Sequence, residues 1–446
     1  MRWLTSLAAL GAVMIVLHRL TATGPVEARA TLALGFLALA AFLTGEMVHE
    51  AGLPRATGYL VIGYIVGPGW TNLVRPDELS LLEMVEQAVV ACVAFGVGGM
   101  LTREAMRRHG RATLRAALGA FVFPFIVVTV VVLSVAPWFP LTEHEPPGDM
   151  LAVALALGVL AGGACPVITL AVAKDDGADG PVTRGTLLIA AALDVILLLA
   201  FPLVLLVARP LASPGTVDLR VALHSLAFTA AGIAVGGALG FVLARFERRV
   251  PQQAGFLFIA FAAIVAVLAA TTGLEPMLVA AAAGAWVANL EPDSYQRLSG
   301  ALGRWNLPVS VLLFVLLGAA FRLEALADLW PWALLLAGLR IVSTRYGLLW
   351  AGRDTLVPPT IARVGWLTLV PQGMVAAVVA LEARRAFPEW GVSFAALAVA
   401  LIAGYQVAGP ICLKRALARV GEVSEGDHVA EADVARGAGA ALGGGL

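Results

Sequence analysis

The sequence predicts an all-α, polytopic membrane protein with 13 or 14 transmembrane helices. Three observations support this fold class: the composition, the regular spacing of hydrophobic segments, and paired interruptions by glycine and proline. Of the 446 residues, 60% are hydrophobic and 13% are charged, and the mean hydropathy is +0.89. Because a soluble domain has about 25% charged residues, most of this chain is expected to lie within a lipid bilayer.

Hydrophobic segments recur along the chain at the length that crosses a bilayer, which is about 20 residues for a helix. After residue 30 they lie at 31–49, 57–74, 84–101, 113–138, 150–173, 185–208, 221–245, 254–272, 276–290, 307–322, 327–351, 359–382 and 392–413. The first 30 residues contain an apolar run and then Ala28-Arg29-Ala30, which has the form of a signal-peptidase site. They are either a retained helix, which we favour, or a cleaved signal peptide.

Two of these segments contain helix-breaking residues at comparable depth. The predicted breakpoints are Gly162, Gly163 and Pro166 in the first segment and Pro371 and Gly373 in the second. Glycine weakens a helix, and proline removes a backbone donor. Broken backbone is tolerated inside a membrane only where protein or a water-filled cavity surrounds it, and there its freed carbonyls can coordinate a cation.

The breakpoints occupy matching places in two halves of the chain. Each half holds six helices, and the helix at about 221–245 joins them, so equivalent helices point in opposite directions. This inverted-repeat plan is typical of secondary transporters. The predicted parts are an N-terminal helix or signal peptide (1–30), a first repeat (31–208), a linker helix (209–250), a second, inverted repeat (251–413) and a disordered cytoplasmic tail (414–446).

One carboxylate, Asp194, lies deep within an apolar segment. Nine residues separate it from Gly185, which places it roughly 14 Å into a hydrocarbon layer about 30 Å thick. A charge at that depth costs at least about 2.5–3.5 kcal/mol and by default indicates an ion or proton site. We therefore expect Asp194 to bind a proton and a monovalent metal cation in turn, the alternative being a structural carboxylate neutralised by a fixed partner.

Arg340 is the matching cation at depth. It either compensates the charge of Asp194 when the site is empty or bonds to the carbonyls of a broken helix. Because arginine keeps its proton in proteins, it cannot be the proton carrier.

Three further side chains near the breakpoints are candidate ion or proton ligands: Cys165, Thr169 and Gln372. For Thr169 the alternative is a hydroxyl bonded to its own helix, and for Cys165 it is a small buried apolar residue. Gln372 stands between Pro371 and Gly373, so its amide is expected at the break itself.

The distribution of arginines predicts the orientation of the helices, because short cytoplasmic loops carry an excess of positive charge. Arginines gather in the loop that contains Arg103 to Arg115 and in alternate loops after it. Arg384 and Arg385 depart from this rule. The pattern predicts a multi-pass protein of the cell membrane with its C-terminus in the cytoplasm.

At these motifs the sequence resembles the monovalent cation:proton antiporter superfamily, the sodium/proton exchanger-like transporters. The stretch from Thr57 to Pro68, TGYLVIGYIVGP, is similar to that family's TGYLLxGxxxGP helix. Supporting stretches are Ala164 to Leu170, Leu313 to Phe321 and Leu369 to Val375, and the resemblance covers about residues 31 to 413.

The resemblance implies a homodimer in which a mobile core domain lies beside a dimerisation domain. It also implies that two broken helices cross next to an ion-binding aspartate, whose position Asp194 occupies, and that Arg340 matches the family's basic residue. Two positions depart from the family: Leu193 stands where a polar residue is usual, and Cys165 stands in the first breakpoint. A cation therefore meets fewer side-chain oxygens, and its identity stays open.

The predicted function is secondary active exchange of sodium or potassium for protons by alternating access, electroneutral, with a role in pH homeostasis. Alternatives are a cation-coupled symporter of a small organic anion and a membrane sensor on the same fold. We expect no enzyme activity, because no nucleophile and base pair occurs at membrane depth, and no cofactor. The net charge of zero gives no sign of nucleic-acid binding, and the three cysteines have no metal-ligand spacing.

Overall fold

The computed structural model describes residues 2–21, 24–51, 54–102, 110–175, 177–212, 219–321, 328–353, 356–387 and 389–423. Within these residues the secondary structure is helical and no strand occurs. The arginine-rich stretch from Arg103 to Arg108 and the tail expected to be disordered from residue 424 onward lie outside the described residues.

The helices follow the order of the hydrophobic segments. The first group is α1 (Arg2–Leu20), α2 (Val26–Glu50), α3 (Arg55–Val66), α4 (Pro76–Leu81), α5 (Glu83–Gly98), α7 (Gly110–Ser134), η1 (Ala136–Trp138), α8 (Pro147–Ala161), α9 (Pro166–Asp175) and α10 (Pro181–Ala212). The second group is α11 (Leu219–Glu247), η2 (Pro251–Gln253), α12 (Ala254–Thr272), α13 (Pro276–Leu290), α14 (Pro292–Ala319), α16 (Trp330–Ala351), α17 (Pro359–Thr368), α18 (Met374–Ala386) and α19 (Gly391–Arg419).

The chain is an all-α, multi-pass membrane protein. Among the described residues, nine helical stretches are long and apolar enough to cross a bilayer, and one of them is the interrupted run Pro147–Ala173. The apolar part of α1 and helices α3 and α13 are shorter. Both segments predicted to break do so: α8 is separated from α9, and α17 from α18.

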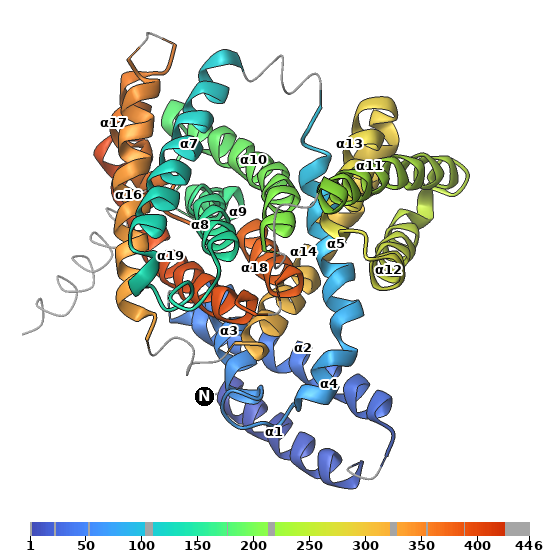
Figure 1. The fold of residues 1–446 in the computed structure, drawn as a ribbon. Helices are drawn as coiled ribbons and strands as arrows, with labels where there is room; N and C mark the ends of the chain where they lie inside the picture. The colour runs from blue at the N-terminus through green and yellow to red at the C-terminus, as the bar shows by residue number, and fades with distance from the viewer. Residues whose placement is uncertain are drawn as a thin grey trace, which may run out of the picture.

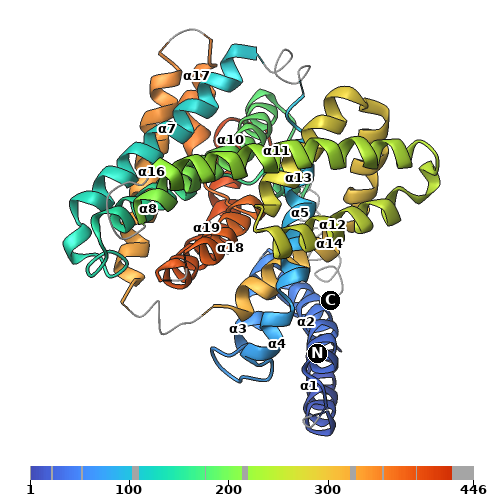
Figure 2. The ribbon, with the colours of Figure 1, turned by 45° about the vertical axis from the view of Figure 1, so that its right-hand side comes forward.

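The helices form two bundles (Figures 1 and 2). The first, which we call the scaffold bundle, contains α2, α3, α5, α11, α12, α13 and α14, with α1 packed on α2. The second, the core bundle, contains α7, α8, α9, α10, α16, α17, α18 and α19. Fewer contacts join the bundles, through pairs such as α10 with α5, α14 with α18, and α18 with α5. Each bundle takes helices from both predicted repeats.

Close helix packing accounts for the glycines of the TGYLVIGYIVGP stretch. A Cβ atom on Gly63 would collide with the carbonyl oxygen of Val315 on α14, and one on Gly318 would collide with that of Leu60 on α3. Small residues let helix backbones approach closely inside a membrane. α3 and α14 therefore meet backbone to backbone.

Several helix boundaries differ from the prediction, among them those of α14 and α19. α14 begins at Pro292 rather than near 307, so Arg297 and Arg304 are helical and not in a loop. Proline is favoured in the first helical turn, and Arg297 pairs there with the buried carboxylate of Glu247 at the end of α11. At the other end of the chain, α19 continues past the expected boundary at 413 to Arg419.

A residue beyond α19 caps the helix that carries Asp194. The Glu422 carboxylate accepts hydrogen bonds from the backbone N–H groups of Val182 and Thr183 at 2.7 Å each and from the Thr183 hydroxyl at 2.7 Å. These N–H groups belong to the first turn of α10, where no partner exists within the helix and a negative charge is favoured.

Candidate functional site: the crossing of two broken helices

The two breaks meet near the centre of the core bundle. Residues 162–165 separate α8 from α9, and residues 369–373 separate α17 from α18. A Cβ atom on Gly373 would collide with the Cys165 sulfur, and one on Gly163 would lie 2.7 Å from the Gln372 amide nitrogen. The two extended segments therefore pack against each other, with the Cys165 and Gln372 side chains filling the space beside the glycines.

The crossing brings together helix ends of both kinds. α8 and α17 end there, and α9 and α18 begin there. The last turn of a helix exposes carbonyl oxygens and carries partial negative charge, and the first turn exposes N–H groups and carries partial positive charge. In an apolar medium each of these groups needs a partner.

The Arg340 side chain, which is 4% exposed, supplies partners to the carbonyl oxygens. It donates hydrogen bonds to the carbonyl oxygens of Ala161 (3.0 Å) and Gly163 (2.6 Å) at the first break and of Leu369 (3.1 Å) and Val370 (3.0 Å) at the second. One guanidinium group therefore ties both C-terminal helix ends together. Of the two roles expected for Arg340, these contacts match bonding to the carbonyls of a broken helix.

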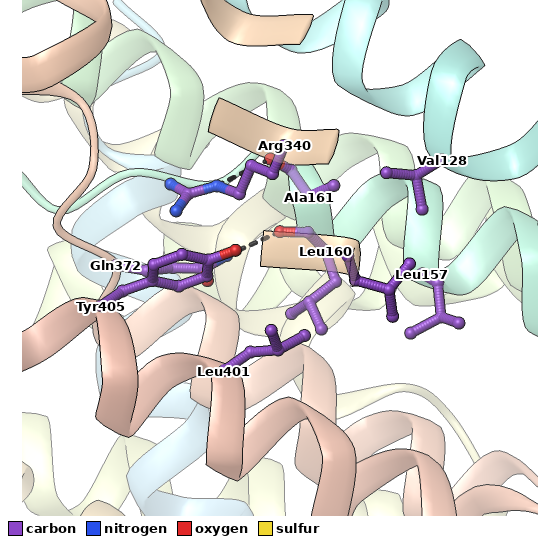
Figure 3. Close-up of a pocket in the computed structure, with 9 residues that line it drawn as sticks. Val128, Leu157, Leu160, Ala161, Arg340, Gln372, Leu401 and Tyr405 are labelled. Atoms are coloured by element: carbon purple, nitrogen blue, oxygen red, sulfur yellow. Dashed lines mark hydrogen bonds between the residues drawn. The ribbon is translucent and has the colours of Figure 1, made fainter. Parts of the chain in front are cut away.

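An aromatic ring and an amide complete the surroundings of Arg340 (Figure 3). The guanidinium carbon lies 4.1 Å from the centre of the Tyr405 ring on α19, where a cation is attracted to the aromatic face. Gln372 donates from Nε2 to the carbonyl oxygen of Leu160 at 2.6 Å, while its Oε1 is buried and has no hydrogen-bond partner. Arg340, Gln372 and Tyr405 line one small cavity.

Asp194 is held in α10 with its side chain 7% exposed. Its Oδ1 atom is buried and has no hydrogen-bond partner, and no ion pair joins it to another described residue. The preceding residue, Leu193, is 1% exposed and has no oxygen in its side chain. An unpaired buried acceptor is costly.

Cys165 connects Asp194 with the N-terminal helix ends. Its sulfur lies near Asp194 and near the N–H groups of Val167, Ile168 and Met374, and Leu197, one turn after Asp194 on α10, lies beside Gly163. These groups belong to the first turns of α9 and α18. The Asp194 carboxylate therefore lies near the two positive helix ends, while Arg340 lies at the two negative ones.

The remaining predicted ligand, Thr169, lies at the same crossing. Its side chain is 1% exposed, and its hydroxyl donates to the carbonyl oxygen of Cys165 at 3.0 Å. This is the bond to its own helix that serine and threonine often make, and it leaves the lone pairs of the oxygen available. The structure thus brings Cys165, Thr169, Gln372, Arg340 and the breakpoint glycines and prolines to one place.

Gln406 and the pairing of Thr186 with Thr368, both in the core bundle, were not predicted from the sequence. Gln406 on α19 is 1% exposed, and its Oε1 has no partner. The hydroxyl groups of Thr186 and Thr368 lie 2.8 Å apart and link α10 to α17. A glutamine in the hydrophobic segment at 392–413 was a usable signal, whereas the threonine pair depends on a contact that only the fold creates.

Comparisons with known proteins agree with this arrangement. The family model described as the transmembrane sodium/hydrogen exchanger matches residues 36–412. Two structures of the sodium proton antiporter MjNhaP1 from Methanocaldococcus jannaschii are similar in fold, with 15% sequence identity and a TM-score of 0.60 each. The alignments cover 88% of this chain and 96% and 99% of the two antiporter chains. In a comparison with curated protein sequences, none matched.

The family match extends over most of the chain and includes both breaks, Asp194 and Arg340. At 15% identity, the similarity to the solved structures concerns the fold alone. From the match to the family model, this chain belongs to the transmembrane sodium/hydrogen exchanger family.

Proposed function

We propose that this protein exchanges a monovalent cation, sodium or potassium, for protons across the cell membrane by alternating access. Asp194 is the group that binds both. The observation that carries the proposal is its buried carboxylate, with Oδ1 unpartnered, beside the crossing of two broken helices. A carboxylate at such depth is unstable as a free charge, so a bound proton or a bound metal cation stabilises it.

Competition between the two ligands at one carboxylate is sufficient for coupling. A proton or a cation, but not both, neutralises Asp194, and either complex moves across with no net charge on the side chain. The empty, charged site is disfavoured in the apolar surroundings, which prevents uncoupled return. One carboxylate per chain then gives one cation per proton and electroneutral exchange.

The oxygen atoms left free at the crossing define the proposed ligands. Arg340 already occupies four carbonyl oxygens of the breaks. Asp194 Oδ1 and Gln372 Oε1 have no partner, and the Thr169 oxygen keeps its lone pairs. We assign the cation to these oxygens, with Cys165 as a neighbour of the carboxylate.

The division into two bundles supports the transport mechanism. The crossing lies wholly within the core bundle, and the contacts between core and scaffold are fewer than those inside each bundle. In the proposed cycle the core bundle moves against the scaffold bundle and carries the ion site from one membrane face to the other. The protein is proposed to be a homodimer, with its C-terminus in the cytoplasm.

The first experiment measures proton flux in proteoliposomes that contain a pH-sensitive dye, with sodium, potassium or lithium added in turn. We expect a cation-dependent pH change in the wild type and its loss, at least a hundredfold in rate, in Asp194→Asn, which cannot ionise. The matched control is Asp179→Asn, because Asp179 lies just before the same helix but is exposed and paired with Arg184.

Two results would contradict the proposal. One is the absence of a response to any monovalent cation from folded wild-type protein, and the other is full exchange by Asp194→Asn. A flux that changes with an imposed membrane potential would contradict the electroneutral stoichiometry alone. The cation that gives the lowest KM identifies the preferred substrate.

A further inference from the structure

The end of α18 far from the ion site carries the two arginines that depart from the charge rule. Arg384 donates from Nη2 to both carboxylate oxygens of Glu86, at 2.9 and 2.7 Å. Glu86 is 6% exposed and lies in the first turn of α5. α18 belongs to the core bundle and α5 to the scaffold bundle, so this buried ion pair joins the two.

A second charged contact crosses the same boundary. Glu382 on α18 is 1% exposed, lies 3.4 Å from Arg385 Nη1, and hydrogen-bonds with Glu275, which precedes α13 of the scaffold bundle. Gln87 on α5 is oriented so that both its side-chain nitrogen and its side-chain oxygen are hydrogen-bonded. The oxygen accepts a hydrogen bond from Arg385 Nη2 at 3.0 Å. We call Glu86, Glu275, Glu382, Arg384 and Arg385 the Arg384 cluster.

The Arg384 cluster and the ion site lie at opposite ends of one short helix. α18 begins at Met374, whose N–H group lies beside Cys165, and Arg384 follows ten residues later. At 1.5 Å per residue this is about 15 Å. A helix of that length moves as a rigid rod, so a shift of the cluster and a shift of the ion site are coupled.

A large cavity opens at the cluster. It has a volume of about 510 Å³, and Glu83, Glu86, Arg384 and Arg385 are among its lining residues, together with residues of α4 and α14 and of the segment that follows α3. Asp194 does not line it. The ion pairs therefore line a cavity between the two bundles, on the face of the molecule opposite the N-terminus of α7.

We propose that the Arg384 cluster is a gate that closes the ion site on this face by holding α18 to the scaffold bundle. The Glu86–Arg384 pair and the Glu275–Glu382 contact must both part before the core bundle can move and open a path from the cavity to the crossing. The inference rests on the proposed function, because it assigns one closed state of the exchange cycle. Arg384→Gln leaves the buried carboxylate of Glu86 without its partner, and Glu86→Gln removes the charge that holds the partly buried Arg384, so either substitution weakens the gate.

The test uses Cys165 as a natural reporter of access to the ion site. The chain has three cysteines, and a Cys92→Ala, Cys412→Ala background leaves Cys165 to react with a membrane-impermeant thiol reagent applied to either face of proteoliposomes. Trp138→Cys, an exposed position at the same end of the molecule, identifies the face in a separate sample. We expect Glu86→Gln and Arg384→Gln to raise the labelling rate from the Arg384 face at least tenfold.

The control is Glu247→Gln, which removes an ion pair with Arg297 of similar kind but within the scaffold bundle. It should leave the labelling rate unchanged. The exchanged pair Glu86→Arg with Arg384→Glu should restore slow labelling, which distinguishes a lost gate from a misfolded protein.

An unchanged rate in Glu86→Gln, an equal increase from both faces, or the same increase in Glu247→Gln would overturn the gate. Labelling needs no cation gradient, so its outcome is independent of the flux assay. If Asp194→Asn loses flux but Glu86→Gln labels at the wild-type rate, the gate proposal is rejected and the exchange proposal stands. If Glu86→Gln and Arg384→Gln label faster but the wild type shows no cation-dependent flux, the gate proposal stands and the exchange proposal is rejected.

Discussion

At the scale of single residues, the crossing separates a permanent charge from a variable one. Arg340 keeps its proton and holds four carbonyl oxygens, whereas Asp194 has an unpartnered oxygen that a proton or a cation can occupy. The arginine therefore maintains the structure of the breaks whatever the ligand state of the carboxylate.

Arg340→Gln should lower the free energy of unfolding by about 3 kcal/mol, because several buried carbonyl groups lose their donors and each unsatisfied group costs about 1–3 kcal/mol. The measurement is thermal unfolding in detergent, followed by tryptophan fluorescence. Arg345→Gln is the control on the same helix, since Arg345 is exposed and lies only over the Trp366 ring. A comparable loss in both variants would show that the carbonyl contacts are not what matters.

Asp194, Arg340 and the breakpoints could be selected as candidate site residues from the sequence. Charged and helix-breaking residues are rare at membrane depth, because they destabilise a helix in an apolar medium. It left the partner of Arg340 open between a carboxylate and backbone carbonyls. That choice depends on where α8 and α17 end in space, which no local pattern encodes. The same holds for the contact between Cys165 and the first turn of α18.

At the scale of helices, close backbone contact makes single glycines essential. Gly63 of α3 faces the α14 backbone, so a methyl group has no space there. Gly63→Ala should destabilise the protein by about 1–3 kcal/mol, as overpacking does. Gly338→Ala on α16, where nothing lies within 4 Å of the added atom, should be neutral or stabilising, since alanine is the better helix former. Equal melting temperatures for the two variants would contradict this account of α3 and α14.

Helix boundaries were predictable where apolar residues or proline define them, as for α12, α13 and both breaks. The first half of α14 was not, because its arginines and polar residues are typical of a loop when taken alone. Its helical state depends on tertiary contacts, among them the pair of Arg297 with Glu247.

At the scale of the whole molecule, α18 joins the two bundles at its end far from the ion site. Arg384 there pairs with Glu86 of α5, and Glu275, Glu86 and Arg385 are the charged groups that face Glu382. The ion site and the boundary between the bundles therefore share one helix.

The cap on α10 has a consequence for how the protein is made. The ion-site helix is completed by Glu422, which follows its first turn by 240 residues in the chain. During synthesis, α10 enters the membrane with two N–H groups unmet, and these groups find their partner only after α19 has been inserted. The helix that carries Asp194 is thus finished among the last steps of assembly, so that an incomplete chain does not yet contain a finished ion site.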